Sequence, residues 1–358
     1  MTANPNLSSI LLDNVPWSAQ APSIWAATAL TLKRNLSRFH FPSKMQKSEK
    51  GQALELLKNL LLNLKELNGA HFFSEEQLSL ADKELLCEHF LMLQGFSQPP
   101  GEAGIVVDQR GGVLALINRD NHLELRALSL SGNWDAVWDL LSKIEAAVAV
   151  QSDVAFSPKF GYLTSDFTQC GTGLLVQSYL HLPALICTNK LVQALPKEEE
   201  DVVAMGLLGN LEELIGDMLV LKNKYTLGLT EESILQSIQT ASSRLVGAEK
   251  TARAEIKEKQ TPQIKDLISK AYGLLMHAYQ LEIKEALGYL SLIKLGIDLG
   301  WISGISDQKM SALFFHIRRG HLSHLFPALG DAKELGHKRA EFLHKELQGI
   351  TLGPQINT

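Results

Sequence analysis

The hydrophobic pattern of this chain changes its period along the sequence, and this change restricts the folds that it can adopt. Residues 50–67 repeat leucine at the spacing of one helical face, whereas residues 104–130 contain short β-rich runs, the last of which alternates apolar and polar residues. Gly111 and Gly112 separate the first two runs and indicate a hairpin. From residue 263 to about 348 the pattern is helical throughout. The chain therefore places a sheet region between helical segments.

Helix start and stop signals refine this pattern in the first half of the chain. Gly69 is expected to end the first helix. Ser74 and Gln77 have the spacing of a capping box, which predicts a second helix that ends near Leu93. Asn133 is placed to cap the helix that follows it.

A longer helix is predicted in the second half of the chain. Thr230 is a good N-cap, and the two glutamates after it suit the first turn of a charged helix that continues through Glu258. Residues 153–228 are expected to form a further sheet region with irregular loops. Residues 1–49 carry no clear periodic signal and are predicted to be an irregular lead-in.

Two proline-containing breaks divide the chain. Pro99, Pro100 and Gly101 interrupt the periodic pattern, and Pro262 restarts the chain after the polar run KEKQTPQ. These breaks predict three regions, which are residues 1–98, 99–260 and 261–358.

Composition limits the class of protein. The 358 residues are 45% hydrophobic and 20% charged, which predicts a buried core, and the formal net charge of −5 argues against a dedicated nucleic-acid binder. No run reaches the roughly 18 apolar residues of a membrane-spanning helix. The N-terminus lacks a secretory pattern, and the three cysteines are odd in number without metal-type spacing, so we expect a cytoplasmic protein with reduced thiols and no membrane association.

Several segments carry a more specific signal. They are AFSPKFGYLTSDFTQCGTGLLVQSYLHLPAL (155–185), IWAATALTLKRNLSRFHFP (24–42), LINRDNHLEL (116–125), YTLGLTEESILQSI (225–238) and KLGIDLGWISGIS (294–306). In order along the chain they resemble the segments of the ATP:guanido phosphotransferases, or phosphagen kinases, and most closely those of the bacterial protein-arginine kinases of the McsB type. The resemblance covers most of residues 15–350.

The resemblance implies an α+β fold of the phosphagen-kinase type, in which helices flank an antiparallel sheet. Residues 1–98 would be a small helical N-terminal subdomain, 99–260 the catalytic-fold domain, and 261–358 an all-helical C-terminal domain of the McsB type. That last domain mediates dimerisation in the family, so the resemblance implies a homodimer. The same apolar side chains could form either its interface or an intramolecular core: Leu290, Ile293, Ile297, Leu299 and Trp301.

The resemblance also implies where ATP would be held. In the family several arginines bind the ATP phosphates, because a guanidinium group is always charged and forms bidentate hydrogen bonds. Five positions implied for such arginines carry no cation here: Ala29, Thr31, Glu124, Leu175 and Met205. Glu124 reverses the charge and would repel a triphosphate. The segments of the fold are thus kept, whereas the charges that phosphoryl transfer needs are absent.

The positions implied for substrate recognition are changed as well. The family's glutamate that grips the substrate guanidinium corresponds to Asp120, which is one methylene shorter, and a second acidic residue corresponds to Asn210. The family's cysteine in the adjoining turn corresponds to Asp166. Asp120 has a simpler interpretation too, because it lies between Asn118 and Asn121 in a typical hairpin turn.

We therefore predict a pseudokinase that has lost ATP binding and phosphoryl transfer, uses no cofactor, and has a regulatory or scaffolding role in protein quality control. Besides the homodimer, the resemblance implies an McsA-type activator and a Clp-type chaperone-protease as partners. The alternative is an active, MgATP-dependent protein-arginine kinase in which relocated cations bind the phosphates: Lys33, Arg34, Arg38 and Arg126.

Other candidate residues have structural interpretations. His122 and His181 fall where the family has histidines, and each is expected in structural hydrogen bonds. Cys170 is expected to be half-buried and inert. No metal site is predicted, because three nearby histidines lack the usual zinc spacing and are expected on a solvated helix face: His316, His321 and His324.

Overall fold

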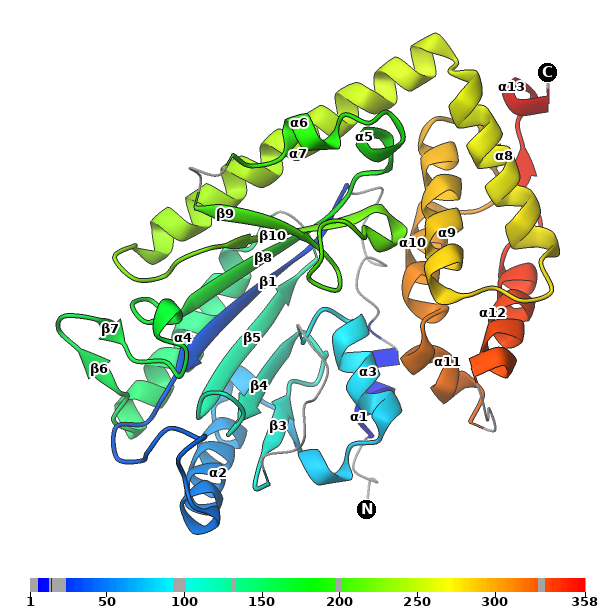
Figure 1. Cartoon of the computed structure of the whole chain (residues 1–358). Coiled ribbons are helices and arrows are strands. Elements are labelled where there is room, and N and C mark those ends of the chain that lie inside the picture. The colour runs from blue at the N-terminus through cyan, green and yellow to red at the C-terminus, as the bar shows by residue number, and fades with distance from the viewer. Residues whose placement is uncertain are drawn as a thin grey trace.

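The computed structural model describes residues 6–12, 14, 24–92, 101–130, 133–197, 201–327 and 332–357. One large sheet carries helices on both faces, and a helical C-terminal part lies against one end of the sheet (Figure 1). Within the described residues, no helix is both long and apolar enough to cross a membrane. The architecture is α+β, with the antiparallel sheet and the helical C-terminal region that the resemblance implied.

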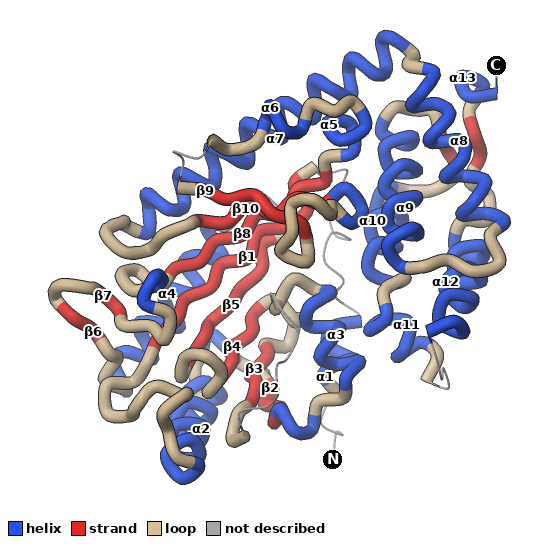
Figure 2. The backbone as a smooth tube through the Cα atoms, viewed as in Figure 1, coloured by secondary structure: helices blue, strands red, loops and turns tan. Residues whose placement is uncertain are grey.

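The large sheet has eight strands in the order β2-β3-β4-β5-β1-β8-β10-β9, and every neighbouring pair is antiparallel (Figure 2). Its strands are β1 (Trp25–Arg34), β2 (His71–Ser74), β3 (Gly104–Val107), β4 (Val113–Ile117), β5 (Leu123–Ser129), β8 (Leu174–His181), β9 (Val202–Gly206) and β10 (Met218–Asn223). Two small sheets are β6 (Phe156–Ser157) with β7 (Gly161–Tyr162), and β11 (Ile302–Ser303) with β12 (Thr351–Leu352).

Strand β1 corrects the prediction that residues 1–49 form an irregular lead-in. It lies between β5 and β8 near the middle of the sheet, and all of its residues except Lys33 are buried. A strand that is covered on both faces shows no alternation of polar and apolar residues, so the pattern gave no strand signal. The same segment also contains helix α1 (Leu7–Leu12).

One face of the sheet packs against three long helices, α2 (Lys47–Leu62), α4 (Asp135–Gln151) and α7 (Glu231–Lys259). The predicted start of α7 is confirmed, because Thr230 Oγ1 accepts a hydrogen bond from the Ser233 amide (3.2 Å). Helix α7 runs the length of the sheet and leads directly into the C-terminal part (Figure 1). Two short helices beside it are α5 (Pro183–Cys187) and α6 (Leu191–Ala194).

The opposite face is covered at β2–β5 by α1 and by α3 (Leu80–Glu88). Helix α3 begins later than predicted. Ser79 forms the capping box with Asp82, whereas Ser74 ends strand β2 and Gln77 ends a single turn of 3-10 helix. The capping-box spacing recurs within a few residues here, and the strand pairing of residues 71–74 with β3 decides between the two candidates.

The C-terminal part is helical, as predicted from residue 263 onward, apart from the β11–β12 pair. Its helices are α8 (Pro262–His277), α9 (Ile283–Asp298), α10 (Asp307–His316), α11 (Arg319–Leu325), α12 (Ala332–Glu346) and α13 (Pro354–Asn357). Four of the five side chains considered for a dimer face are buried within the protomer: Leu290, Ile293, Leu299 and Trp301. The intramolecular alternative accounts for them, so a homodimer would need another surface.

Because Leu290 is fully buried on α9, replacing it with alanine is expected to lower the free energy of unfolding by about 2–5 kcal/mol. Leu274 on α8 is 43% exposed, and Leu274→Ala is the matched control with an expected change below about 1 kcal/mol. Urea unfolding followed by circular dichroism measures both. Equal effects of the two substitutions would contradict the intramolecular core.

Candidate functional site

The five positions that the resemblance assigns to phosphate-binding arginines lie on one face of the large sheet. Strand register places them together, because cross-strand partners share a face and side chains alternate along each strand. The pairs that set this face are Thr31 with Arg126 and Leu175, Ala29 with Gln177, Lys33 with Glu124, Gln177 with Lys222, and Met205 with Val220. We call it the candidate face, defined by Ala29, Thr31, Glu124, Leu175 and Met205 and the side chains between them.

Arg126 occupies the middle of the candidate face. It is 3% exposed, and its Nη2 donates to Gln177 Oε1 (2.8 Å) and the Tyr179 hydroxyl (3.1 Å). Its Nη1 donates to Thr31 Oγ1 (3.2 Å), and its Nε donates to the Phe90 carbonyl (2.9 Å). A buried charge is tolerated only when its donors are paired, so these four acceptors hold the guanidinium group in place.

Phe90 covers this part of the candidate face. Its ring stacks on Tyr179 with the centroids 4.1 Å apart and meets Phe315 edge-on at 5.5 Å. Phe90 has a φ of 61°, in the left-handed region that a bulky residue adopts only when its surroundings enforce it. Ala29 and Thr31 are 0% and 3% exposed, so these two positions are closed to a phosphate group.

Two lysines carry the other positive charges of the candidate face. Lys33 is the cross-strand partner of Glu124 on β5. A hydrogen bond from Thr168 is the main cause of the lowered pKa of Asp166, and Lys33 adds a smaller attraction that stabilises the same carboxylate. Lys222 on β10 is half-buried and forms no ion pair with any residue that the structure describes.

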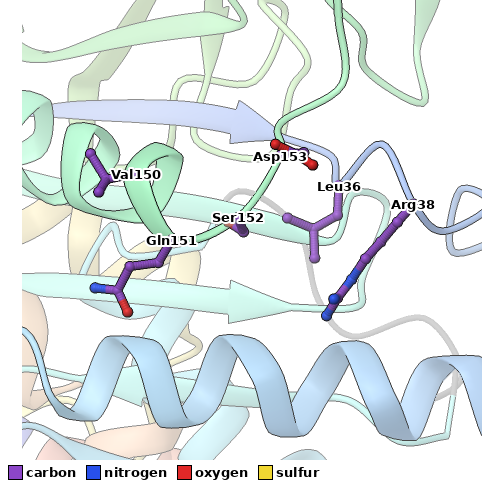
Figure 3. A pocket seen from close by; sticks show the side chains of 6 residues that line it. All are labelled: Leu36, Arg38, Val150, Gln151, Ser152 and Asp153. Atoms are coloured by element: carbon purple, nitrogen blue, oxygen red, sulfur yellow. The ribbon is translucent and has the colours of Figure 1, made fainter.

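Arg34 and Arg38 do not serve the candidate face as relocated ligands. Arg34 is buried, donates from Nε to Glu145 (2.8 Å) and from Nη1 to the Thr172 carbonyl (3.0 Å), and stacks on the Tyr162 ring at 3.6 Å. Arg38 lies beyond the end of β1, at a cavity of about 170 Å³ beside the last turn of α4 (Figure 3). Of the four cations proposed as substitutes, Lys33 alone lies half-exposed on the candidate face.

The two positions implied for gripping a guanidinium substrate lie in surface loops. Asp120 is exposed in the turn between β4 and β5, where its backbone carbonyl accepts a hydrogen bond from Ser165 Oγ. Asn210 is exposed in the loop after β9, and its Oδ1 accepts from the Glu212 amide (2.9 Å). Asp166 caps the turn that follows it by accepting from the Thr168 amide (2.9 Å). The hairpin-turn interpretation accounts for the position of Asp120.

The histidines at the family positions have structural partners, as predicted. His122 Nδ1 accepts from the Leu36 amide (3.1 Å), and burial lowers its pKa to about 4. His181 Nε2 lies 2.7 Å from Ser291 Oγ, inside the contact between β8 and α9, and burial lowers its pKa. Cys170 is 9% exposed and lies beside Thr164, so it is more deeply buried than predicted.

The cluster of three histidines is not a solvated helix face, so that prediction is wrong. His321 is 0% exposed on α11 and donates or accepts at both ring nitrogens. His324 is half-buried and lies 3.3 Å from Asp82 of α3. The sequence could not show that α11 packs against a helix from the opposite end of the chain. Among the described residues, no group of three or more potential ligands could hold a metal ion.

MgATP does not fit the residues of the candidate face. Ala29 and Thr31, near the centre of the face, are buried, and Thr31 accepts a hydrogen bond from Arg126. One of the remaining positions is the carboxylate of Glu124. A surface cavity of about 280 Å³ lies elsewhere, between the β6–β7 hairpin and the start of α7.

Sequence reasoning missed several residues that define the candidate face. Gln177 and Tyr179 accept from Arg126, and the Phe90 carbonyl does so as well. Gln177 and Tyr179 lie in the segment 155–185 that carries the resemblance, but no role was assigned to them. Lys222 was missed because only strand register places it beside Gln177. The alternation of VQSYLH along β8 was the available signal, and it becomes informative only once the neighbouring strands are known.

Comparisons with known proteins agree with this architecture. Residues 52–252 match the family model of the ATP:guanido phosphotransferase C-terminal catalytic domain, and residues 261–356 match that of the protein-arginine kinase McsB C-terminal domain. A protein-arginine kinase from Chlamydia pneumoniae is 36% identical over 344 residues, which cover 93% of this chain and 94% of that protein. One from Halothermothrix orenii is 28% identical, over 90% of this chain and 92% of that protein.

Solved structures show the same fold at lower identity. The duplicated taurocyamine kinase from Schistosoma mansoni, with bound transition state analog components, matches with a TM-score of 0.58 and 20% identity, over 70% of this chain and 36% of that one. A lombricine kinase matches with a TM-score of 0.56 and 16% identity, over 70% of this chain and 76% of that one.

Because Arg126 holds four acceptors, Arg126→Met is expected to lower the free energy of unfolding by about 2–4 kcal/mol, since the acceptors would stay buried without their donor. Arg38→Met removes an exposed cation and should change stability by less than about 0.5 kcal/mol. Urea unfolding distinguishes them. A stability of Arg126→Met equal to that of the unsubstituted protein would show that the guanidinium group is not anchored.

Proposed function

We propose that this chain is a pseudokinase which acts by binding. The premise is its family, because the chain belongs to the ATP:guanido phosphotransferases and carries a C-terminal domain of the McsB type. It would have lost ATP binding and phosphoryl transfer to arginine while keeping the fold. Its role would then be regulatory or scaffolding, in protein quality control.

The anchored guanidinium group of Arg126 carries this proposal. In the middle of the candidate face the positive charge is already satisfied by Gln177, Tyr179, Thr31 and the Phe90 carbonyl. A phosphate group that approached Arg126 would have to compete with these acceptors and displace the Phe90 ring from Tyr179. The arginine is therefore part of the packing of the protein rather than an open phosphate ligand.

The charges that remain are too few to replace the family's arginines. Removal of one preorganised donor from a catalytic site typically costs about 2.7–4 kcal/mol of barrier, which is roughly 100–1,000-fold in rate. Several such losses do not add linearly, but five positions without a cation support a loss of many orders of magnitude. Lys33 and Lys222 are point charges and lack the planar fork that pairs with phosphate oxygens, and Glu124 lies opposite Lys33.

The partners that we propose come from the family resemblance. They are a second copy of the chain, an McsA-type activator and a Clp-type chaperone-protease. A binding role agrees with a chain that keeps its helix caps and sheet register while its catalytic positions differ. In this role the protein would act through binding at its folded surface and would catalyse no reaction.

A second candidate function is that of an active, MgATP-dependent protein-arginine kinase. The comparisons favour it, because relatives that carry this name match nearly the whole chain, with up to 36% identity among those described above. Lys33 and Lys222, both half-exposed on the candidate face, would then have to supply the phosphate contacts. This candidate also needs Arg126 to move, since its guanidinium group is bonded to Thr31 Oγ1 and to the Phe90 carbonyl.

The two candidates predict opposite results in one assay. The purified full-length chain is incubated with MgATP and an arginine-rich protein, and phosphoarginine is measured by mass spectrometry. We expect no product above the background without enzyme, because the candidate face lacks open arginines. A protein-arginine kinase with arginines at all five positions is the positive control.

Phosphoarginine that depends on the chain would contradict the pseudokinase and support the second candidate. In that case Lys222→Met and Lys33→Met should each reduce the rate by roughly 100-fold, whereas Arg38→Met should not. A signal that depends on the chain and survives both lysine substitutions would still contradict the pseudokinase, and would show that other residues supply the phosphate contacts.

A further inference from the structure

Helices α3 and α11 come from distant parts of the chain and pack against each other (Figure 1). Acidic side chains of α3 meet basic side chains of α11 in this contact. On α3, Asp82 lies 3.3 Å from His324, and Glu84 lies 3.4 Å from Arg319. These outer pairs are partly exposed, so their contribution to stability is small. The centre of the contact is buried and has a more specific arrangement.

Glu88 is the carboxylate at the centre. It accepts hydrogen bonds from the amides of Gly320 (2.8 Å) and His321 (3.2 Å) and from His321 Nδ1 (2.8 Å). Its backbone carbonyl accepts from Arg318 Nη1 (3.3 Å). A single residue at the end of α3 therefore holds the start of α11 through both its side chain and its backbone.

His89 and His321 form the second half of this centre. Their Nε2 atoms lie 3.1 Å apart, and their rings are nearly parallel, with an interplanar angle of 10° and centroids 5.0 Å apart. Because His321 Nδ1–H donates to Glu88, the Nε2 of a neutral His321 is an acceptor, and His89 Nε2–H is its donor. Only one proton can lie between the two Nε2 atoms, so the contact requires one of them to be unprotonated. A positive charge on either ring would also be buried near Arg318.

The same contact positions Phe90, which lies over the candidate face. Phe90 follows His89 directly, so the position of the histidine sets the position of the phenylalanine. The Phe90 ring stacks on Tyr179 and its carbonyl accepts from Arg126 Nε. Loss of the His89–His321 contact would therefore free the segment that covers the centre of the sheet.

We propose that Glu88, His89 and His321 form an acid-sensitive latch, which holds α3 against α11 while both histidines are neutral and releases the segment around Phe90 when they take up protons. The latch is independent of whether the chain transfers phosphate, because it consists of a contact between two parts of the fold.

Proton counting gives the direction of the pH dependence. Burial lowers the pKa of His321 to about 3 and that of His89 well below its ordinary value, so the closed latch excludes these two protons. Burial raises the pKa of Glu88 to about 7, so the closed latch binds one proton there as the pH falls. In the open state the histidines and Glu88 would have their ordinary pKa values, so at about pH 5 this state would bind about two protons, both on the histidines. The closed state would bind about one proton, on Glu88. Acid therefore favours opening by about one net proton, or about tenfold per pH unit.

Other titratable and charged groups surround the latch, on each element that packs against it. They are Asp82, Glu84 and Cys87 of α3, His316 of α10, Arg318, Arg319 and His324 at α11, Arg339 of α12, and Arg126 and Tyr179 of the sheet. The arginines stay charged across the range, and burial raises the pKa of Cys87 to about 11. Burial lowers the pKa of His316, and its protonation would add positive charge beside the latch and act in the same direction as the proposal.

Hydrogen exchange of the full-length protein tests the latch. Exchange is measured by mass spectrometry at pH 7.5 and pH 5.0, with rates corrected for the intrinsic effect of pH on amide chemistry. We expect the opening equilibrium of peptides from residues 80–92 and 319–325 to rise about tenfold or more at pH 5.0. Peptides from the buried part of α7 are the internal control and should keep their protection. Equal protection of the latch peptides at both pH values would overturn the proposal.

Two substitutions separate the latch from a general effect of acid. His321→Gln and His89→Gln each remove one titrating ring, so either variant should lose most of the pH dependence at residues 80–92. His277→Gln is the matched control, because His277 is exposed at the end of α8. Near-ultraviolet circular dichroism checks that each variant folds, and either one is sufficient for the test. Full retention of the pH dependence in a folded variant would contradict the latch.

Discussion

The fixed guanidinium group of Arg126 is the interaction on which the interior of this protein depends. It joins β1, β5 and β8 to the segment after α3 through bonds to Thr31, Gln177, Tyr179 and Phe90. An arginine cannot escape burial by losing its proton, so its acceptors must stay where they are. The absence of cations at the family's phosphate positions and the presence of this internal one belong to a single arrangement of the sheet face.

Membership of the family does not determine the chemistry of the site. The family is carried by hundreds of residues that set strand register, helix caps and core packing, whereas phosphoryl transfer depends on a few charged groups aimed at one place. In this chain the first set is intact, and the five positions that the resemblance assigns to phosphate-binding arginines carry no cation. The anchored position of Arg126 supports the pseudokinase proposal, whereas the identity to protein-arginine kinases favours the second candidate.

Much of the fold could be predicted, and the failures have physical causes. The start of α7 at Thr230 followed from its capping residue, and the resemblance implied the antiparallel sheet. Strand β1 was missed because it is buried on both faces and has no alternation. The five positions of the candidate face came from the resemblance, whereas Gln177, Lys222 and Phe90 could not be found, since their roles depend on contacts between distant strands and loops. The buried position of His321 was missed for the same reason, because its partner lies on α3.

The proposed loss of ATP binding depends on one property of the candidate face, which is that it has too few open cations to hold a triphosphate. Isothermal titration calorimetry of the full-length chain with MgATP measures this most directly, with a protein-arginine kinase that carries the five arginines as the positive control. The account predicts no saturable heat at nucleotide concentrations up to the millimolar range, together with an unchanged melting temperature. A saturable titration with a micromolar Kd, abolished by Lys222→Met, would contradict it.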